Sequence, residues 1–153
     1  MPHRSSIEPV LPVPKALIVT HAGYIYPGIV AAAAYNLIGS SLVSRVVLLG
    51  PSHKVPLKSI DLSSAAYFMT PLGYVATNKV CVDALLELPC VELNDQTNVH
   101  DHSLEVQIPF LQRVLGRFNI LPVIVQRRAP LTVFFVVIVC TAACWVACII
   151  IAK

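Results

Sequence analysis

Two histidines of this 153-residue chain stand where side chains can bind a metal. His21 and His53 each follow a short apolar, β-branched run that ends in a turn, and imidazole nitrogen is a common ligand of iron, copper and zinc. A single histidine beside such a turn is more often a surface or hydrogen-bonded residue. Two at equivalent positions keep both interpretations open, and a catalytic metal site needs at least a third ligand.

The runs before the two histidines predict β-strands at residues 16–20 and 45–50. Residues 27–38 between them are rich in alanine and carry no charge, which favours a buried crossover helix. A strand–helix–strand unit makes its strands parallel, and we expect these two to be neighbours. Both histidines then follow the carboxyl ends of strands, at the edge where open α/β sheets bind ligands.

The middle of the chain continues this α/β pattern. Residues 60–63 alternate as a short strand, and residues 67–75 contain a Pro and Gly turn that predicts two antiparallel strands. Asn78 is expected to cap a helix that runs to about Leu88. Residues 91–100 are polar and are predicted to form a loop.

A second amphipathic helix is predicted where leucines and isoleucine recur at helical spacing, at Leu104, Ile108, Leu111 and Leu115. Pro109 should kink or break it, and residues 119–125 should form another buried strand. His102 and Glu105 are three apart and share a face of this helix. They either face a metal, or Glu105 accepts backbone N–H groups of the first turn while His102 bonds locally. The residues alone favour the local role.

Four motifs occur in an order and spacing that resemble the Memo family, called AmmeMemoRadiSam system protein B in prokaryotes. They are HAGY at residues 21–24, LGPSH at 49–53, TPLG at 70–73 and HSLEVQIPFL at 102–111. The resemblance runs from about Lys15 to Val125. That family is in turn similar to the class III extradiol dioxygenases, which hold non-heme iron through two histidines and a distant third ligand.

The resemblance implies a mixed, largely parallel sheet sandwiched by helices. It also implies that His21 and His53 are ligands of iron or copper. The remaining candidate residues, expected to line the cleft, are Tyr24, Ser52, His102 and Glu105. Signalling proteins or a second copy of the chain are the expected partners, and a cytoplasmic location is expected.

The domain is expected to be incomplete, because the resemblance stops at Gln126. The family's second half, which supplies a cysteine as third ligand and a further cleft histidine, is not found. We therefore expect a metal-binding protein that is not catalytic and has a signalling or redox role. Two alternatives stay open: an oxidoreductase of the extradiol dioxygenase type, and a metal-free interaction module tethered to a membrane.

Residues 131–152 are uncharged and, as a helix, are long enough to cross the ~30 Å core of a bilayer. This predicted apolar C-terminal helix, within segment 127–153, is either a membrane anchor or a stretch read out of the true frame after Val125. Residues 1–14 contain several prolines and are predicted to be an extended leader, which leaves 15–126 as the partial domain.

The net charge of +3 does not indicate nucleic-acid binding. The surplus comes from Arg127, Arg128 and Lys153 beside the apolar stretch, and the rest of the chain is neutral. A basic patch is therefore missing from the partial domain. The five cysteines show no metal-finger spacing and are expected to be reduced thiols.

Overall fold

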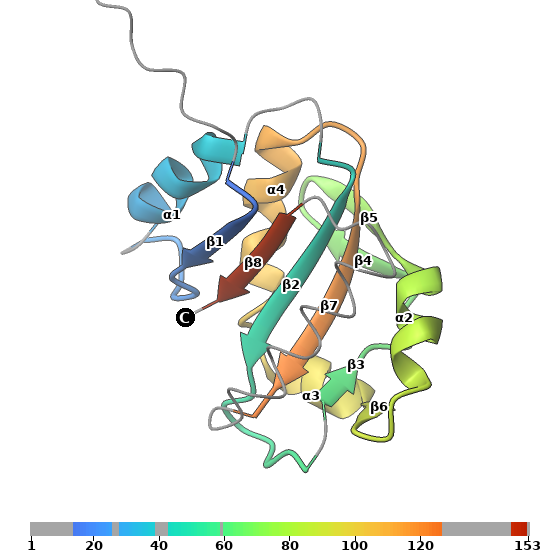
Figure 1. Ribbon diagram of the computed structural model, residues 1–153. Helices are drawn as coiled ribbons and strands as arrows, with labels where there is room; N and C mark the ends of the chain where they lie inside the picture. Colours follow the sequence, from blue (N-terminus) through green and yellow to red (C-terminus); the bar gives the residue numbers. More distant parts are fainter. Residues whose placement is uncertain (1–13, 26–27, 39–42, 59, 127–147, 153) are drawn as a thin grey trace, which may run out of the picture.

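The computed structural model describes residues 14–25, 28–38, 43–58, 60–126 and 148–152. In chain order the elements are β1 (Ala16–Val19), α1 (Gly28–Tyr35), the 3₁₀ turn η1 (Asn36–Ile38), β2 (Arg45–Pro51), β3 (Ile60–Leu62), β4 (Tyr67–Thr70), β5 (Gly73–Thr77), α2 (Lys79–Leu86), β6 (Val91–Leu93), α3 (Asp95–His100), the 3₁₀ turn η2 (Glu105–Gln107), α4 (Ile108–Val114), β7 (Asn119–Val125) and β8 (Cys148–Ala152). The strands form one eight-stranded sheet in the order β1-β8-β2-β7-β3-β6, with β5 paired to β7 and β4 to β5 (Figure 1). The predicted mixed, largely parallel α/β sheet is confirmed.

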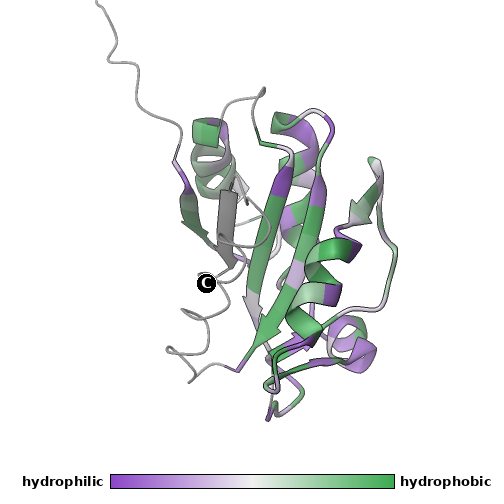
Figure 2. Cartoon of the chain, turned by 45° about the vertical axis from the view of Figure 1, so that its right-hand side comes forward, coloured by the Kyte–Doolittle hydropathy of each residue, from purple (hydrophilic) through white to green (hydrophobic). Residues whose placement is uncertain are grey.

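Apolar side chains cover both faces of the central strands. Along β2, Val46 and Leu48 pack in the cluster that contains α1 and α4, whereas Val47 and Leu49 pack in the cluster that contains α2. Successive residues of a strand point to opposite faces, so an unbroken apolar run suits a strand buried on both. Figure 2 shows this hydrophobic character along β2 and β7. Helices therefore cover the sheet on its two faces.

The strand β8 corrects two predictions. It lies between β1 and β2 and is parallel to each, so β1 and β2 are parallel but are not neighbours. Residues 148–152 of the predicted apolar helix form this strand instead. Their sequence, CIIIA, has the β-branched residues that favour a strand, and hydropathy by itself cannot tell an apolar strand from an apolar helix.

Other predictions fall outside the described residues: the leader up to residue 13, and residues 127–147 of the tail. None of the described helices has the length and apolar character needed to cross a membrane.

The crossover helix α1 is confirmed, but its predicted burial holds for one side only. Ala31 and Tyr35 are buried against the sheet, whereas Ile29 and Val30 are 86% and 64% exposed. Lack of charge did not predict which side packs, because the neighbouring elements decide this.

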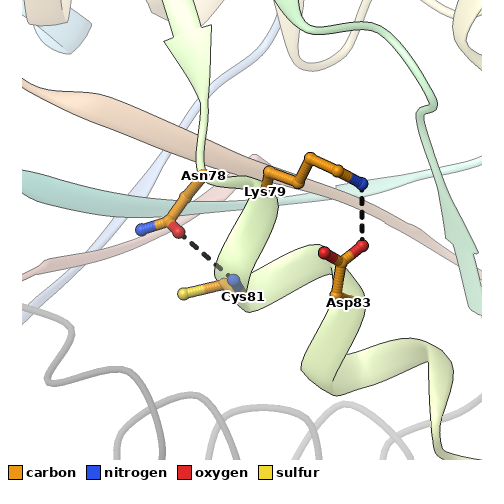
Figure 3. A network of polar contacts seen from close by, with 4 residues as sticks. All are labelled: Asn78, Lys79, Cys81 and Asp83. Carbon is orange, nitrogen blue, oxygen red and sulfur yellow. Dashed lines mark hydrogen bonds and ion pairs between the residues drawn. The ribbon is translucent and has the colours of Figure 1, made fainter.

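The hairpin β4–β5 and the helix α2 follow the prediction. The TPLG turn joins the two antiparallel strands, and Gly73 has a φ of 113°, a conformation that favours glycine. The side chain of Asn78 caps α2 by accepting a hydrogen bond from the backbone N–H of Cys81 (Figure 3). The helix ends at Leu86, slightly before the predicted end.

The predicted loop over residues 91–100 is wrong. Val91–Leu93 forms β6, which pairs in parallel with β3, and Asp95–His100 forms α3. The polar sequence gives no strand pattern here, and the strand forms by pairing with β3, which lies far away in the chain. In α3, the buried hydroxyl of Thr97 donates to a carboxylate oxygen of Asp61 in β3. This tertiary contact holds a segment that has little apolar surface of its own.

The predicted break at Pro109 is confirmed. A 3₁₀ turn, η2, precedes α4, and Pro109 stands in the first turn of α4, where its missing N–H would have no partner within the helix. The helix then buries Ile108 and Leu111. The break leaves residues 101–107 as a separate segment that runs beside the ends of β1 and β2.

Candidate functional site

The two predicted histidines meet at one edge of the sheet. His21 follows β1 and His53 follows β2, and their Nε2 atoms are 2.8 Å apart. The ring centroids are 4.9 Å apart, and the ring planes are tilted by 41°. The structure thus brings together two side chains that are 32 positions apart in the sequence.

The register of the sheet explains this meeting. Val19 of β1 is level with Ala152 of β8, and Leu49 of β2 is level with Ile151. The strands β1 and β2 therefore end at nearly the same height although β8 separates them. Each histidine follows after a short turn, so the two imidazoles reach across the end of the intervening strand.

A third imidazole lies beside the pair. The ring of His102 is nearly parallel to that of His53, with an interplanar angle of 19° and 6.4 Å between centroids. His102 is exposed and comes from the segment between α3 and η2. The structure therefore places His102 at the same edge as His21 and His53.

The carboxylate of Asp101 fixes the backbone of the His53 turn. Its Oδ2 accepts a hydrogen bond from the backbone N–H of His53 at 2.7 Å, and its Oδ1 accepts one from the N–H of Ser103 at 2.8 Å. Burial raises the pKa of Asp101, but the hydrogen bonds from Ser103 and His53 outweigh this and leave its pKa below the ordinary value. Asp101 therefore stays ionised beside His53.

The other predicted cleft residues lie around this edge in different roles. The hydroxyl of Ser52 bonds to the backbone carbonyl of Val55 within its own turn. The ring of Tyr24 lies edge-on to Phe110, with centroids 5.5 Å apart. Partial burial, and then the carboxylate of Glu105, raise the pKa of Tyr24, which places Glu105 near this phenol. Ser52 thus bonds within the turn that contains His53, and Tyr24 packs against Phe110 of α4.

A small hollow opens next to His53. Its volume is about 200 Å³, and it is lined by Ser52, His53, residues 54–57 and Gln126. It is smaller than the ~300–1,000 Å³ of typical pockets for drug-sized ligands. It has room for a small molecule beside the imidazole.

The spacing of the two imidazoles fits two kinds of contact. Two imidazoles that bind one ion at about 2.0–2.1 Å, with an angle near 90° at the metal, have nitrogens about 3 Å apart. A distance of 2.8 Å is also normal for a hydrogen bond, in which one ring donates and the other accepts according to its tautomer. Within the described ranges, no group of three or more His, Cys, Asp or Glu side chains is arranged to hold a metal.

Two polar residues near the site, Asp101 and Gln107, were not singled out from the sequence. Gln107 is 1% exposed; its Nε2 donates to the carbonyl oxygen of Thr20 at 3.0 Å, and its Oε1 accepts from the hydroxyl of Tyr35 at 2.6 Å. Gln107 stands three residues after Leu104, so the helical pattern places its amide on the predicted apolar face. Buried polar groups need hydrogen-bond partners, so this was a usable indication.

Comparison with known proteins places these residues in a family. The profile of the family described as Memo-like protein matches residues 5–138. The match extends beyond the predicted resemblance of residues 15–125 at both ends.

Individual relatives agree with the profile. A MEMO1 family protein of Aquifex aeolicus is 42% identical over 113 residues, which cover 73% of this chain and 42% of that protein. The protein memo-1 homolog of Caenorhabditis elegans is 39% identical over 114 residues, or 72% of this chain and 33% of that protein. Protein MEMO1 of Danio rerio is 37% identical over 116 residues, or 72% of this chain and 39% of that protein. The chain spans less than half the length of each of these relatives, and it belongs to the Memo-like family.

Proposed function

We propose that this chain is a metal-binding protein that holds iron or copper through Nε2 of His21 and Nε2 of His53. The observation that carries the proposal is the 2.8 Å separation of these two atoms at the carboxyl-terminal edge of the sheet. Imidazole nitrogen suits both metals. A bound iron or copper ion supplies one-electron redox chemistry, so the proposed role is in redox or signalling rather than in catalytic turnover.

The surroundings of the pair support a cationic ligand. Asp101 is ionised beside His53, and its negative charge favours a metal ion at this edge. The exposure of His53 gives an ion a path from solvent. The role of His102, whose ring faces that of His53, is to shield one side of the site and to offer a further imidazole at its rim.

Metal titration tests the proposal directly. Calorimetry with Cu²⁺, and with Fe²⁺ under nitrogen, should show one ion per chain for the unchanged protein. His21→Ala and His53→Ala should each weaken binding by at least about tenfold, because each removes a ligand. His100→Ala is the matched control, since His100 is an exposed histidine at the end of α3, and it should leave the affinity unchanged.

Two results would contradict the proposal. One is an affinity that neither His21→Ala nor His53→Ala alters. The other is the lack of any binding of Cu²⁺ or Fe²⁺ by the unchanged protein, in which case the 2.8 Å contact is a hydrogen bond between two imidazoles.

The catalytic alternative has its own measurement. Oxygen uptake with catechol and ferrous iron should not exceed that of the His21→Ala variant. Turnover that depends on His21 would instead support an oxidoreductase of the extradiol dioxygenase type.

A further inference from the structure

One short segment, residues 101–107, bonds to the backbone of the turns that contain both histidines. Asp101 bonds to the backbone of His53, and Gln107 bonds to the carbonyl group of Thr20, the residue before His21. We infer that residues 101–107 act as a clamp that sets the separation of the two imidazoles, with Asp101 and Gln107 as positioning residues. The effect on metal affinity rests on the proposed function, whereas the effect on the imidazole separation does not.

On the His53 side, the clamp holds the chain at two successive points. Asp101 is 7% exposed and accepts the N–H of His53, which orients the peptide group that carries this residue. Ser103 is fully buried, and its hydroxyl donates to the carbonyl oxygen of Pro51 at 3.4 Å. The turn that contains His53 is therefore tied to the clamp on both sides of Ser52.

On the His21 side, the side-chain amide of Gln107 holds the chain in the same way. The bond from Gln107 to Thr20 fixes the carbonyl of the peptide group whose nitrogen belongs to His21. The hydroxyl of Tyr35 in α1 donates to the other end of the same amide. Turning the amide over would place its oxygen against the carbonyl oxygen of Thr20 and lose that bond. Buried hydrogen bonds of this kind are costly to leave unmade.

The clamp itself packs closely against the sheet. Gln107 belongs to the 3₁₀ turn η2, and its N–H donates to the carbonyl oxygen of Leu104 at 3.0 Å. Leu104 is 3% exposed and packs directly over the backbone of Gly50 in β2. A Cβ on Gly50 would stand 2.6 Å from Cδ2 of Leu104, so the close approach depends on this glycine. The clamp therefore contacts β2 through Leu104 and α1 through Gln107.

A purely structural role predicts a different outcome from a positioning role. Loss of a buried hydrogen bond lowers stability in either case. Only the positioning role changes how many imidazoles bind the metal at once. The test needs a control that loses a comparable amount of stability elsewhere in the fold.

Asn78→Ala is that control. Asn78 caps α2, and its backbone N–H bonds to the carbonyl oxygen of Ile120, which is level with Val46 near the start of β2. It lies at the opposite end of the sheet from the histidines, which follow the strand ends.

The variants are Asp101→Asn, which replaces one acceptor oxygen by a donor, and Gln107→Met, which keeps the length of the side chain and removes its amide. Copper affinity is measured by titration, and the number of bound nitrogens by electron paramagnetic resonance. Asp101→Asn and Gln107→Met should each weaken binding by about 10- to 100-fold and reduce the spectrum from two imidazole nitrogens to one. Asn78→Ala should leave affinity and spectrum unchanged. If Gln107→Met does not fold, Tyr35→Phe keeps the amide but removes the bond that orients it, and a smaller shift in the same direction is expected.

The outcomes separate this inference from the proposed function. Unchanged affinity and a two-nitrogen spectrum in both variants would overturn the clamp and leave metal binding intact. If the unchanged protein binds no metal, the proposed function fails. Crystal structures of the metal-free variants then test whether the clamp sets the separation of the two imidazoles. A wider Nε2 separation than 2.8 Å would then support it, and an unchanged separation would overturn it.

Discussion

The hydroxyl of Tyr35 donates a hydrogen bond of 2.6 Å to Oε1 of Gln107, across 72 positions of the sequence. Tyr35 is fully buried and Gln107 is 1% exposed, so this bond forms inside the protein. The ring of Tyr35 also stacks on Phe110, with centroids 5.2 Å apart and planes within 5°. The contact joins α1 to the segment that supports the histidine pair.

Tyr35→Phe should lower the free energy of unfolding by about 1–3 kcal/mol, because it leaves Oε1 of Gln107 buried with one bond fewer while the ring packing is kept. Urea denaturation measures this. Tyr74→Phe is the matched control, since Tyr74 is 72% exposed, and it should change the stability by less than about 0.5 kcal/mol. Equal stability of the two variants would contradict a stabilising hydrogen bond between Tyr35 and Gln107.

Gly50→Ala should destabilise the protein by about 1–3 kcal/mol through overpacking. The added Cβ would stand 2.5 Å from Oγ of Ser103 and 2.6 Å from Cδ2 of Leu104. At Gly116 an added Cβ meets nothing within 4 Å, so Gly116→Ala should be tolerated. Denaturation midpoints of the two variants give the comparison, and a Gly50→Ala protein as stable as the unchanged one would show that residues 103–104 can move away.

Asn78→Ala should cost about 1 kcal/mol of stability, because the N–H of Cys81 loses its cap. Lys79→Ala, one residue later, removes an ion pair of 2.9 Å with Asp83 (Figure 3). Lys79 and Asp83 are largely exposed, and such pairs contribute about 0–1 kcal/mol. In thermal unfolding, Asn78→Ala should therefore have a lower melting temperature than Lys79→Ala. The reverse order would contradict the capping role.

The pH dependence of stability should report on Asp95. Hydrogen bonds from the side chain and backbone of Ser64, and from the hydroxyl of Ser63, lower the pKa of this carboxyl in the folded protein. A lowered folded pKa means that the stabilisation is complete above the unfolded pKa of about 3.9 and is lost as the pH falls through the folded pKa. The stability difference between the unchanged protein and Asp95→Asn should therefore be constant from about pH 5 to 7 and shrink below pH 4. Denaturation at a series of pH values measures it, and a difference that grows on acidification would contradict the prediction.

Local patterns in the sequence were enough for most of the fold. The Asn78 cap, the Pro and Gly turn before β5, and the break at Pro109 depend on residues within one or two turns of each other. The placement of His21 and His53 past strand ends followed from the same kind of pattern. These features were predictable because their causes are short-range.

Three features depended on partners far away in the chain. β6 forms because β3 offers it a parallel partner, and β8 separates β1 from β2, which the strand–helix–strand pattern could not indicate. The contacts of Asp101 and Gln107 with the two histidine turns likewise cross the fold.

The sequence by itself determined which side chains stand at the ends of the strands, since alternation, turn residues and caps act locally. Only the tertiary structure decided that two of these imidazoles lie 2.8 Å apart and that a buried amide and a buried carboxylate hold their turns. The physical reason is that separation between distant residues depends on sheet register and on buried hydrogen bonds, and both are satisfied only when the whole fold has formed.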